Sequence, residues 1–127
     1  MAELPITSIT AAIAAVMLVV LGLLAGTRRT RSKILLGTSG DDILLRRVRA
    51  HGNFTEYVPT ALILLALTEA MGSSGTLLWT MAGLLIVGRA LHIISILGTV
   101  LPARATGMVM TLVSILIGAG VLLSAYL

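Results

Sequence analysis

The fold is decided by the stretch Ile6–Ala25, which reads ITSITAAIAAVMLVVLGLLA and contains no ionisable residue. At ~1.5 Å rise per residue, a helix of this length can cross a hydrocarbon core of roughly 30 Å. Three further runs carry few or no charges: Phe54–Met71, Leu77–Leu97 and Thr106–Leu127. Their apolar residues are continuous rather than alternating, which excludes a β-barrel. The sequence predicts an all-α integral membrane protein, a single domain over residues 1–127 forming a four-transmembrane-helix bundle, with helices near 6–25, 44–71, 77–97 and 104–126.

The composition agrees with a membrane location and limits the chemistry. Of the 127 residues 57% are hydrophobic and 11% are charged, and the mean hydropathy is +1.08. The net charge is +4, but aromatic residues make up only 3% and the basic residues adjoin an apolar segment, so we expect a membrane surface and no nucleic acid as partner. The chain has no cysteine, so any thiol in its chemistry must come from a cofactor or substrate.

The distribution of basic residues predicts the orientation. Most of them lie in the first connection, Thr27–Arg49, and the third connection, Gly98–Arg104, adds another. Positive residues stay on the cytoplasmic side, so both connections should be cytoplasmic and both termini should lie opposite. The first run follows Glu3 rather than a basic segment, which favours a retained helix over a signal peptide. Small residues four apart permit close helix approach: Gly22 and Gly26, Ser114 and Gly118.

The second apolar run is entered through a polar stretch, RRVRAHGNFTEYVP at positions 46–59. On a helix at ~100° per residue, Arg49, Asn53 and Glu56 lie within about 60° of one another and share one face. Because a charge in the middle of a membrane span costs ~2.5 to 3.5 kcal/mol, such groups are expected to be paired and to line a cavity or an interface. The pattern thus predicts a polar site at the cytoplasmic boundary.

The same residues also allow a purely structural interpretation. Glu56 would then pair with Arg89, which lies roughly 12 Å inside the third helix and shares a face with His92. No metal site is expected, since His51 and His92 have no metal-ligand spacing with a carboxylate or with each other. Glu69, near the outer end of its helix, is expected to be interfacial. A ligand site and a structural network both remain open on physical grounds.

Three motifs resemble the MAPEG family, the membrane-associated proteins in eicosanoid and glutathione metabolism. They are RVRAHGNFTEYVP at positions 47–59, GRALH at 88–92 and RATG at 104–107. Length, helix number and predicted orientation are similar too. The resemblance implies a homotrimer that binds glutathione as co-substrate between neighbouring subunits, near the cytoplasmic side.

The resemblance also implies the site residues. Those that would bind glutathione are Arg28, Arg49, Asn53, Glu56, Tyr57 and Arg89. Arg104 would be the catalytic residue, because it matches the arginine that stabilises the thiolate. A guanidinium beside a thiol favours the nucleophilic anion, so this assignment is chemically reasonable.

The expected activity is that of a glutathione transferase or peroxidase acting on lipophilic electrophiles or lipid hydroperoxides in the membrane. The stretch His92–Ile96 lacks the tyrosines of the eicosanoid-synthesising branches, which disfavours leukotriene or prostaglandin synthesis. The short second connection resembles bacterial-type members, implying a multi-pass protein of a bacterial inner membrane. One alternative is a non-catalytic scaffold or lipid-binding subunit with this fold. Another is a small multidrug transporter, which is disfavoured because the first helix lacks the ionisable residue that such exporters carry there.

Overall fold

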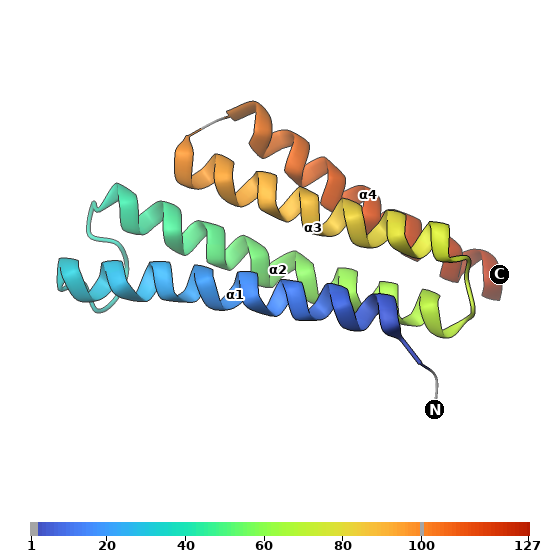
Figure 1. Cartoon of the computed structure of the whole chain (residues 1–127). Coiled ribbons are helices and arrows are strands. Elements are labelled where there is room, and N and C mark those ends of the chain that lie inside the picture. Colours follow the sequence, from blue (N-terminus) through green and yellow to red (C-terminus); the bar gives the residue numbers. More distant parts are fainter. Residues whose placement is uncertain (1–2, 100) are drawn as a thin grey trace.

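Four long helices make up the computed structural model, which describes residues 3–99 and 101–127 (Figure 1). The helices are α1 (Pro5–Ser32), α2 (Asp42–Ala70), α3 (Gly75–Gly98) and α4 (Leu101–Tyr126). No strand occurs among the described residues. The predicted all-α bundle of four helices is therefore confirmed, while residues 1–2 and Val100 lie outside the described part of the predicted domain.

Three of the helices, α1, α3 and α4, are long and apolar enough to cross a membrane by length and composition. α2, with 29 residues, is also long enough, but it is more polar because it carries the stretch predicted to form the site. Pro59 lies inside α2 without ending it. Proline is tolerated in membrane helices because neighbouring groups can satisfy the freed backbone carbonyl.

At the end of the bundle where α1 connects to α2 and α3 connects to α4, the helices extend further than the sequence predicted. α1 continues past residue 25 to Ser32, since arginine is a good helix former, and it ends where Lys33 adopts a left-handed conformation with φ of 56°. α2 begins after Asp41, whose side chain accepts a hydrogen bond from the Leu44 backbone N–H. α4 begins before Arg104, because proline at position 102 is compatible with the first turn of a helix. The polar connection between α1 and α2 is thus much shorter than the predicted Thr27–Arg49.

Both termini lie at one end of the bundle, and the α1–α2 and α3–α4 connections lie at the other (Figure 1). This arrangement (Figure 1) is expected for four consecutive antiparallel helices, while the path of the chain through a membrane stays a prediction. α3 and α4 pack most extensively against each other, and α2 contacts all three other helices. Which end faces the cytoplasm stays a prediction from the basic residues.

Glycines allow the close approach of α3 and α4. A Cβ atom at Gly107 would lie 2.5 Å from the Gly88 carbonyl oxygen, and one at Gly88 would lie 2.8 Å from the Gly107 carbonyl oxygen. Further along α4, a Cβ atom at Gly118 would meet Met81 at 2.8 Å. The predicted role of Gly118 in close packing is confirmed, whereas a Cβ atom at Gly26 would meet nothing within 4 Å.

Glu69 caps the first helix. Its carboxylate accepts hydrogen bonds from the backbone N–H groups of Ile6 at 2.9 Å and Thr7 at 2.7 Å. α1 has no cap from its own N-terminal residues, because Leu4 at the cap position offers no acceptor side chain. A carboxylate from the last turn of α2 supplies what is missing and also favours the positive end of the α1 dipole. Glu69 therefore has a structural role, capping α1, that the sequence did not indicate.

We expect Glu69→Ala to destabilise the protein by about 2 kcal/mol, because two charge-assisted capping bonds are lost. The quantity to measure is the free energy of unfolding in detergent. Glu56→Ala is the matched control, since Glu56 is also on α2, is exposed and makes no hydrogen bond among the described residues. Equal stability of the Glu69→Ala and Glu56→Ala variants would contradict the capping role.

Candidate functional site

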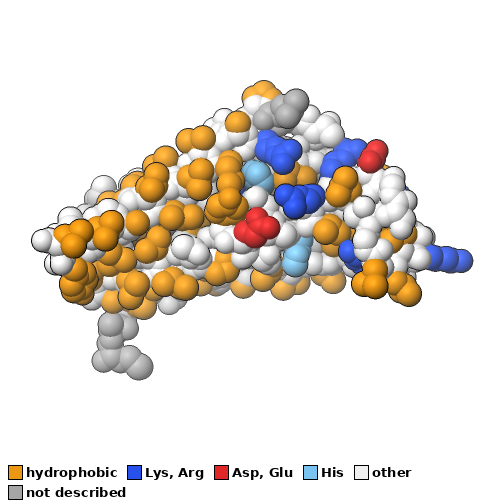
Figure 2. Space-filling view, turned by 180° about the vertical axis from the view of Figure 1, so that it is seen from behind, with side chains coloured by type: hydrophobic (Ala, Val, Ile, Leu, Met, Phe, Trp, Pro, Cys, Tyr) orange, Lys and Arg blue, Asp and Glu red, His pale blue; other side chains and the backbone are white. Residues whose placement is uncertain are grey.

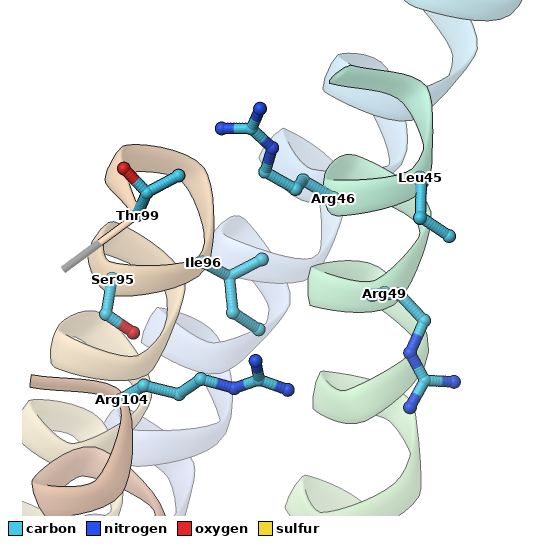
Figure 3. A pocket seen from close by; sticks show the side chains of 7 residues that line it. All are labelled: Leu45, Arg46, Arg49, Ser95, Ile96, Thr99 and Arg104. Atoms are coloured by element: carbon cyan, nitrogen blue, oxygen red, sulfur yellow. The ribbon is translucent and has the colours of Figure 1, made fainter. Parts of the chain in front are cut away.

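A pocket of about 340 Å³ opens between the start of α2, the end of α3 and the start of α4. Figure 3 shows its lining side chains, which are Leu45, Arg46, Arg49, Ser95, Ile96, Thr99 and Arg104. Three of the seven carry guanidinium groups and none carries a carboxylate. The pocket is therefore suited to an anionic ligand.

The three guanidinium groups come from two helices. Arg46 and Arg49 are one turn apart on α2, whereas Arg104 projects from the first turns of α4 toward α2 (Figure 3). Arg46 extends toward α3 across the upper side of the pocket (Figure 3). On the face shown in Figure 2, the Lys and Arg side chains gather in one half, and hydrophobic side chains dominate the other. The site thus lies in the polar half, next to an apolar surface.

A second group of polar residues is buried beside the pocket. Arg89 on α3 is 1% exposed and donates to Asn53 Oδ1 at 2.6 Å and to Thr111 Oγ1 at 2.9 Å. The centre of its guanidinium lies 5.9 Å from the centroid of the Tyr57 ring, and Nη2 lies 3.8 Å from the Met108 sulfur. These contacts join α2, α3 and α4 through one side chain. They fix the relative positions of the three helices that line the pocket.

The pair between Glu56 and Arg89 that the purely structural interpretation requires does not form. Arg89 bonds instead to Asn53, one turn earlier on α2, and no carboxylate lies within 4.0 Å of it in residues 3–99 and 101–127. Glu56 is exposed on α2 and does not line the pocket. The three residues predicted to share one face of α2 therefore have different surroundings. Arg49 lines the pocket, Asn53 belongs to the buried network, and Glu56 lies at the surface of the single chain.

Arg28 lies outside the pocket lining and is engaged with Asp41. Its Nε donates to Asp41 Oδ2 at 2.9 Å, and Ser32 Oγ donates to the same oxygen at 2.7 Å. The Leu44 backbone N–H donates to the other carboxylate oxygen at 2.9 Å. The backbone hydrogen bond from Leu44, then that from Ser32, and then Arg28 hold the pKa of Asp41 well below its ordinary value of 3.8. Asp41 thereby ties the end of α1 to the start of α2.

Because the pKa of Asp41 is lowered in the folded state, its contribution to stability is present above the ordinary pKa and is lost as the pH falls below 3.8. We expect the unfolding temperature to fall with pH in this acidic range, and Asp41→Asn to weaken that dependence. Thermal unfolding at a series of pH values measures it. Asp42→Asn is the control, since the neighbouring carboxylate makes no hydrogen bond within the described ranges. An unchanged pH dependence in Asp41→Asn would contradict the prediction.

His92 connects α3 to the backbone of Arg104, the residue predicted to be catalytic. Its Nδ1 lies 3.3 Å from the Arg104 carbonyl oxygen. A carbonyl oxygen only accepts, so Nδ1 must carry the proton in this contact. His92 is 4% exposed, and its Nε2 has no hydrogen-bond partner in the described part of the chain. The contact helps to fix the start of α4, and thus Arg104, against α3.

Five of the seven pocket residues were not predicted from the sequence: Leu45, Arg46, Ser95, Ile96 and Thr99. Arg46 was detectable, because helical periodicity already places it near the face of Arg49. Ser95 gave no signal, since its place at the pocket depends on how α3 meets α4. Among the described residues, no group of three or more His, Cys, Asp or Glu side chains is arranged to hold a metal ion.

The chain was compared with known proteins. The model of the MAPEG family matches residues 7–124, which is nearly the whole chain and covers part or all of each of the four helices. Neither a curated protein nor a solved structure matches. The match covers the polar stretch of α2, the buried Arg89 and the pocket residue Arg104 alike, and by this extent the chain belongs to the MAPEG family of membrane proteins.

Proposed function

We propose that the protein is a glutathione-dependent membrane transferase or peroxidase acting on lipophilic electrophiles or lipid hydroperoxides. The observation that carries the proposal is the pocket lined by Arg46 and Arg49 of α2 and by Arg104 of α4. Membership of the MAPEG family, whose members are associated with eicosanoid and glutathione metabolism, supports the same ligand.

The pocket suits the charge and size of glutathione. The tripeptide carries two carboxylates, and arginine binds carboxylates through paired N–H donors. A volume of about 340 Å³ falls within the roughly 300 to 1,000 Å³ of small-molecule sites. Arg46 and Arg49 would bind carboxylates, which leaves the guanidinium of Arg104, on the opposite wall, for the thiol.

The chemistry then depends on the thiolate. A free thiol has a pKa of about 8.5, and a neighbouring guanidinium lowers it by favouring the anion. In transfer, the thiolate sulfur forms a bond to an electrophilic carbon, whose leaving group departs with the bonding electrons. In peroxide reduction, two glutathione molecules supply two electrons and end as the disulfide, while the hydroperoxide becomes an alcohol and water. The apolar partner reaches the pocket from the bilayer.

Assembly as a homotrimer completes the proposal. Glu56 is exposed on α2, one turn after Asn53, so a copy packed against α2 would cover its carboxylate. A carboxylate there would pair with the glutathione ammonium, and Tyr57 would lie next to it. Asn53 and Arg89 would act mainly by holding α2 and α3 in place, since Arg89 is almost fully buried. Arg28 pairs with Asp41 and does not line the pocket of its own chain, so it would contact glutathione bound to a neighbouring copy.

The proposal is tested by titrating the purified protein in detergent with glutathione while following thiolate absorbance in the near ultraviolet. We expect a saturable signal, weakened about tenfold to a hundredfold in affinity by Arg49→Gln, because a charged hydrogen bond contributes ~1.5 to 3 kcal/mol. Arg31→Gln is the control, since Arg31 is exposed at the end of α1 and away from the pocket. Absence of saturable binding would refute the proposal, and binding without thiolate would favour the non-catalytic alternative.

A further inference from the structure

Arg46 lies with a further arginine, Arg47, at the head of an apolar groove on another side of the bundle. A pocket of about 280 Å³ is lined by Leu24 of α1, Ile43, Arg46 and Arg47 of α2, and Leu97 of α3. Leu24 and Leu97 also line a groove of about 300 Å³ between α1 and α3. The remaining lining of that groove is wholly apolar: Val16, Met17, Val20, Leu21, Ala90, Ile93 and Ile94. Basic head and apolar groove thus form one continuous depression.

The length of the groove matches one leaflet of a bilayer. From Val16 to Leu24 it follows α1 for eight residues, or about 12 Å at 1.5 Å per residue. Half of a hydrocarbon core of roughly 30 Å is about 15 Å. A groove of this length, with its arginines at the membrane boundary, would end near the bilayer centre.

The surfaces around the groove are suited to lipid rather than water. Val16, Val20 and Ile94 are each about half exposed or more, at 65%, 49% and 63%. The polar groups at the head are guanidinium donors, and neither arginine forms an ion pair with an acid in the described part of the chain. Arg47 Nη1 donates to the Leu24 carbonyl oxygen at 2.8 Å, which leaves four of its five N–H groups, and Arg46 makes no hydrogen bond within the described ranges. Asp42, one turn before Arg46, forms no ion pair with it there.

We propose that this depression binds one anionic phospholipid, with the phosphate between Arg46 and Arg47 and an acyl chain in the α1–α3 groove. Charge complementarity selects the headgroup, because guanidinium forks match phosphate oxygens. The shape of the depression favours a lipid over a free anion, because the depression continues into an apolar groove about as long as one leaflet is thick. A comparable groove between α1 and α2, about 250 Å³ in volume, has no basic residue in its lining and offers no such headgroup site.

The site is distinct from the proposed glutathione pocket except for Arg46, which lines both. Lipid binding requires neither a thiol nor a thiolate. It can therefore be tested independently of the proposed function.

The test is native mass spectrometry of the purified full chain, released from detergent after equilibration with either dioleoyl phosphatidylglycerol or dioleoyl phosphatidylcholine. We expect phosphatidylglycerol to be retained in preference to phosphatidylcholine. Arg47→Gln should weaken phosphatidylglycerol binding about tenfold, as expected for loss of a charged hydrogen bond. Ala90→Phe, which adds an aromatic ring to the groove lining and leaves Arg46 and Arg47 unchanged, should weaken binding of the same lipid at least as much.

The controls separate the lipid site from other occupants. Arg31→Gln removes an equal charge from the same end of the bundle, and Ala12→Phe adds an equal side chain to an exposed position of α1 outside the groove; both should bind lipid as wild type does. Equal retention of the two lipids, or equal weakening by Arg31→Gln, overturns the proposal. So does displacement of phosphatidylglycerol by millimolar inorganic phosphate, which would indicate an anion site alone. A changed oligomeric mass in Ala90→Phe with lipid binding intact would show that another copy of the chain occupies the groove.

Discussion

Replacement of Arg104 by alanine is expected to abolish the glutathione thiolate signal and to lower kcat by about 10²- to 10³-fold, the range seen when one preorganised donor to a developing or stable anion is removed. The geometry supports so large an effect. Arg104 projects from α4 across the pocket, while the two other guanidinium groups come from α2 (Figure 3). With two cations left to bind the carboxylates of glutathione, none would remain at the sulfur.

Two further comparisons separate the binding of glutathione from the formation of its thiolate. Arg104→Lys retains the positive charge and should keep part of the thiolate signal, although lysine lacks the planar fork of arginine. Arg104→Ala should reduce affinity for glutathione less than it reduces the thiolate signal, because Arg46 and Arg49 still line the pocket. A full thiolate signal in Arg104→Ala, together with its loss in Arg89→Ala, would transfer the role from Arg104 to Arg89.

Much of the fold was predictable from hydropathy alone. The four apolar runs located all four helices, because a membrane span leaves its length and composition in the sequence. The helix ends were less predictable. Arg28 and Arg31 look like part of a polar loop, but α1 continues through them, and the boundary is set by the left-handed residue Lys33 and by the capping side chain of Asp41.

The candidate site was predictable only in part. Helical periodicity placed Arg49, Asn53 and Glu56 on one face, and the structure divides them among a pocket, a buried network and the surface. An angular spread of about 60° is enough for this division, since Asn53 at one edge of the face bonds to Arg89 of α3 while Glu56 at the other edge is exposed. Hydrogen-bond partners between helices depend on register, which hydropathy does not encode. For that reason Arg89 found Asn53 rather than Glu56.

The approach of α3 to α4 gave no clear signal in the sequence. Ser114 and Gly118, four residues apart on α4, indicated a packing face, and Ser114 Oγ does donate to the Met81 carbonyl oxygen at 2.8 Å. The tightest contact, however, joins single glycines from two different helices, Gly88 and Gly107. Neither has another glycine four residues away on its own helix, so helical spacing does not predict that the two pack against each other, although they belong to the GRALH and RATG motifs.

Gly107→Ala is therefore expected to combine a loss of stability with a loss of activity, although Gly107 does not line the pocket. The new Cβ atom would lie 2.5 Å from the Gly88 carbonyl oxygen and 2.7 Å from the His92 backbone nitrogen. Both are backbone atoms, so the helices must separate, and overpacking of this kind costs about 1 to 3 kcal/mol. The unfolding free energy in detergent measures that cost.

The effect on activity follows from the position of Arg104, which lies less than one turn before Gly107 and whose carbonyl contacts His92. A displacement near 1 Å can lower a rate about 10²-fold, so kcat should fall by tenfold to a hundredfold. Gly120→Ala is the matched control on the same helix, because its Cβ atom would meet nothing within 4 Å. That variant should be unchanged or more stable by up to about 1 kcal/mol, since alanine favours the helix. If Gly107→Ala resembled Gly120→Ala in both stability and kcat, close contact between α3 and α4 would not be what positions Arg104.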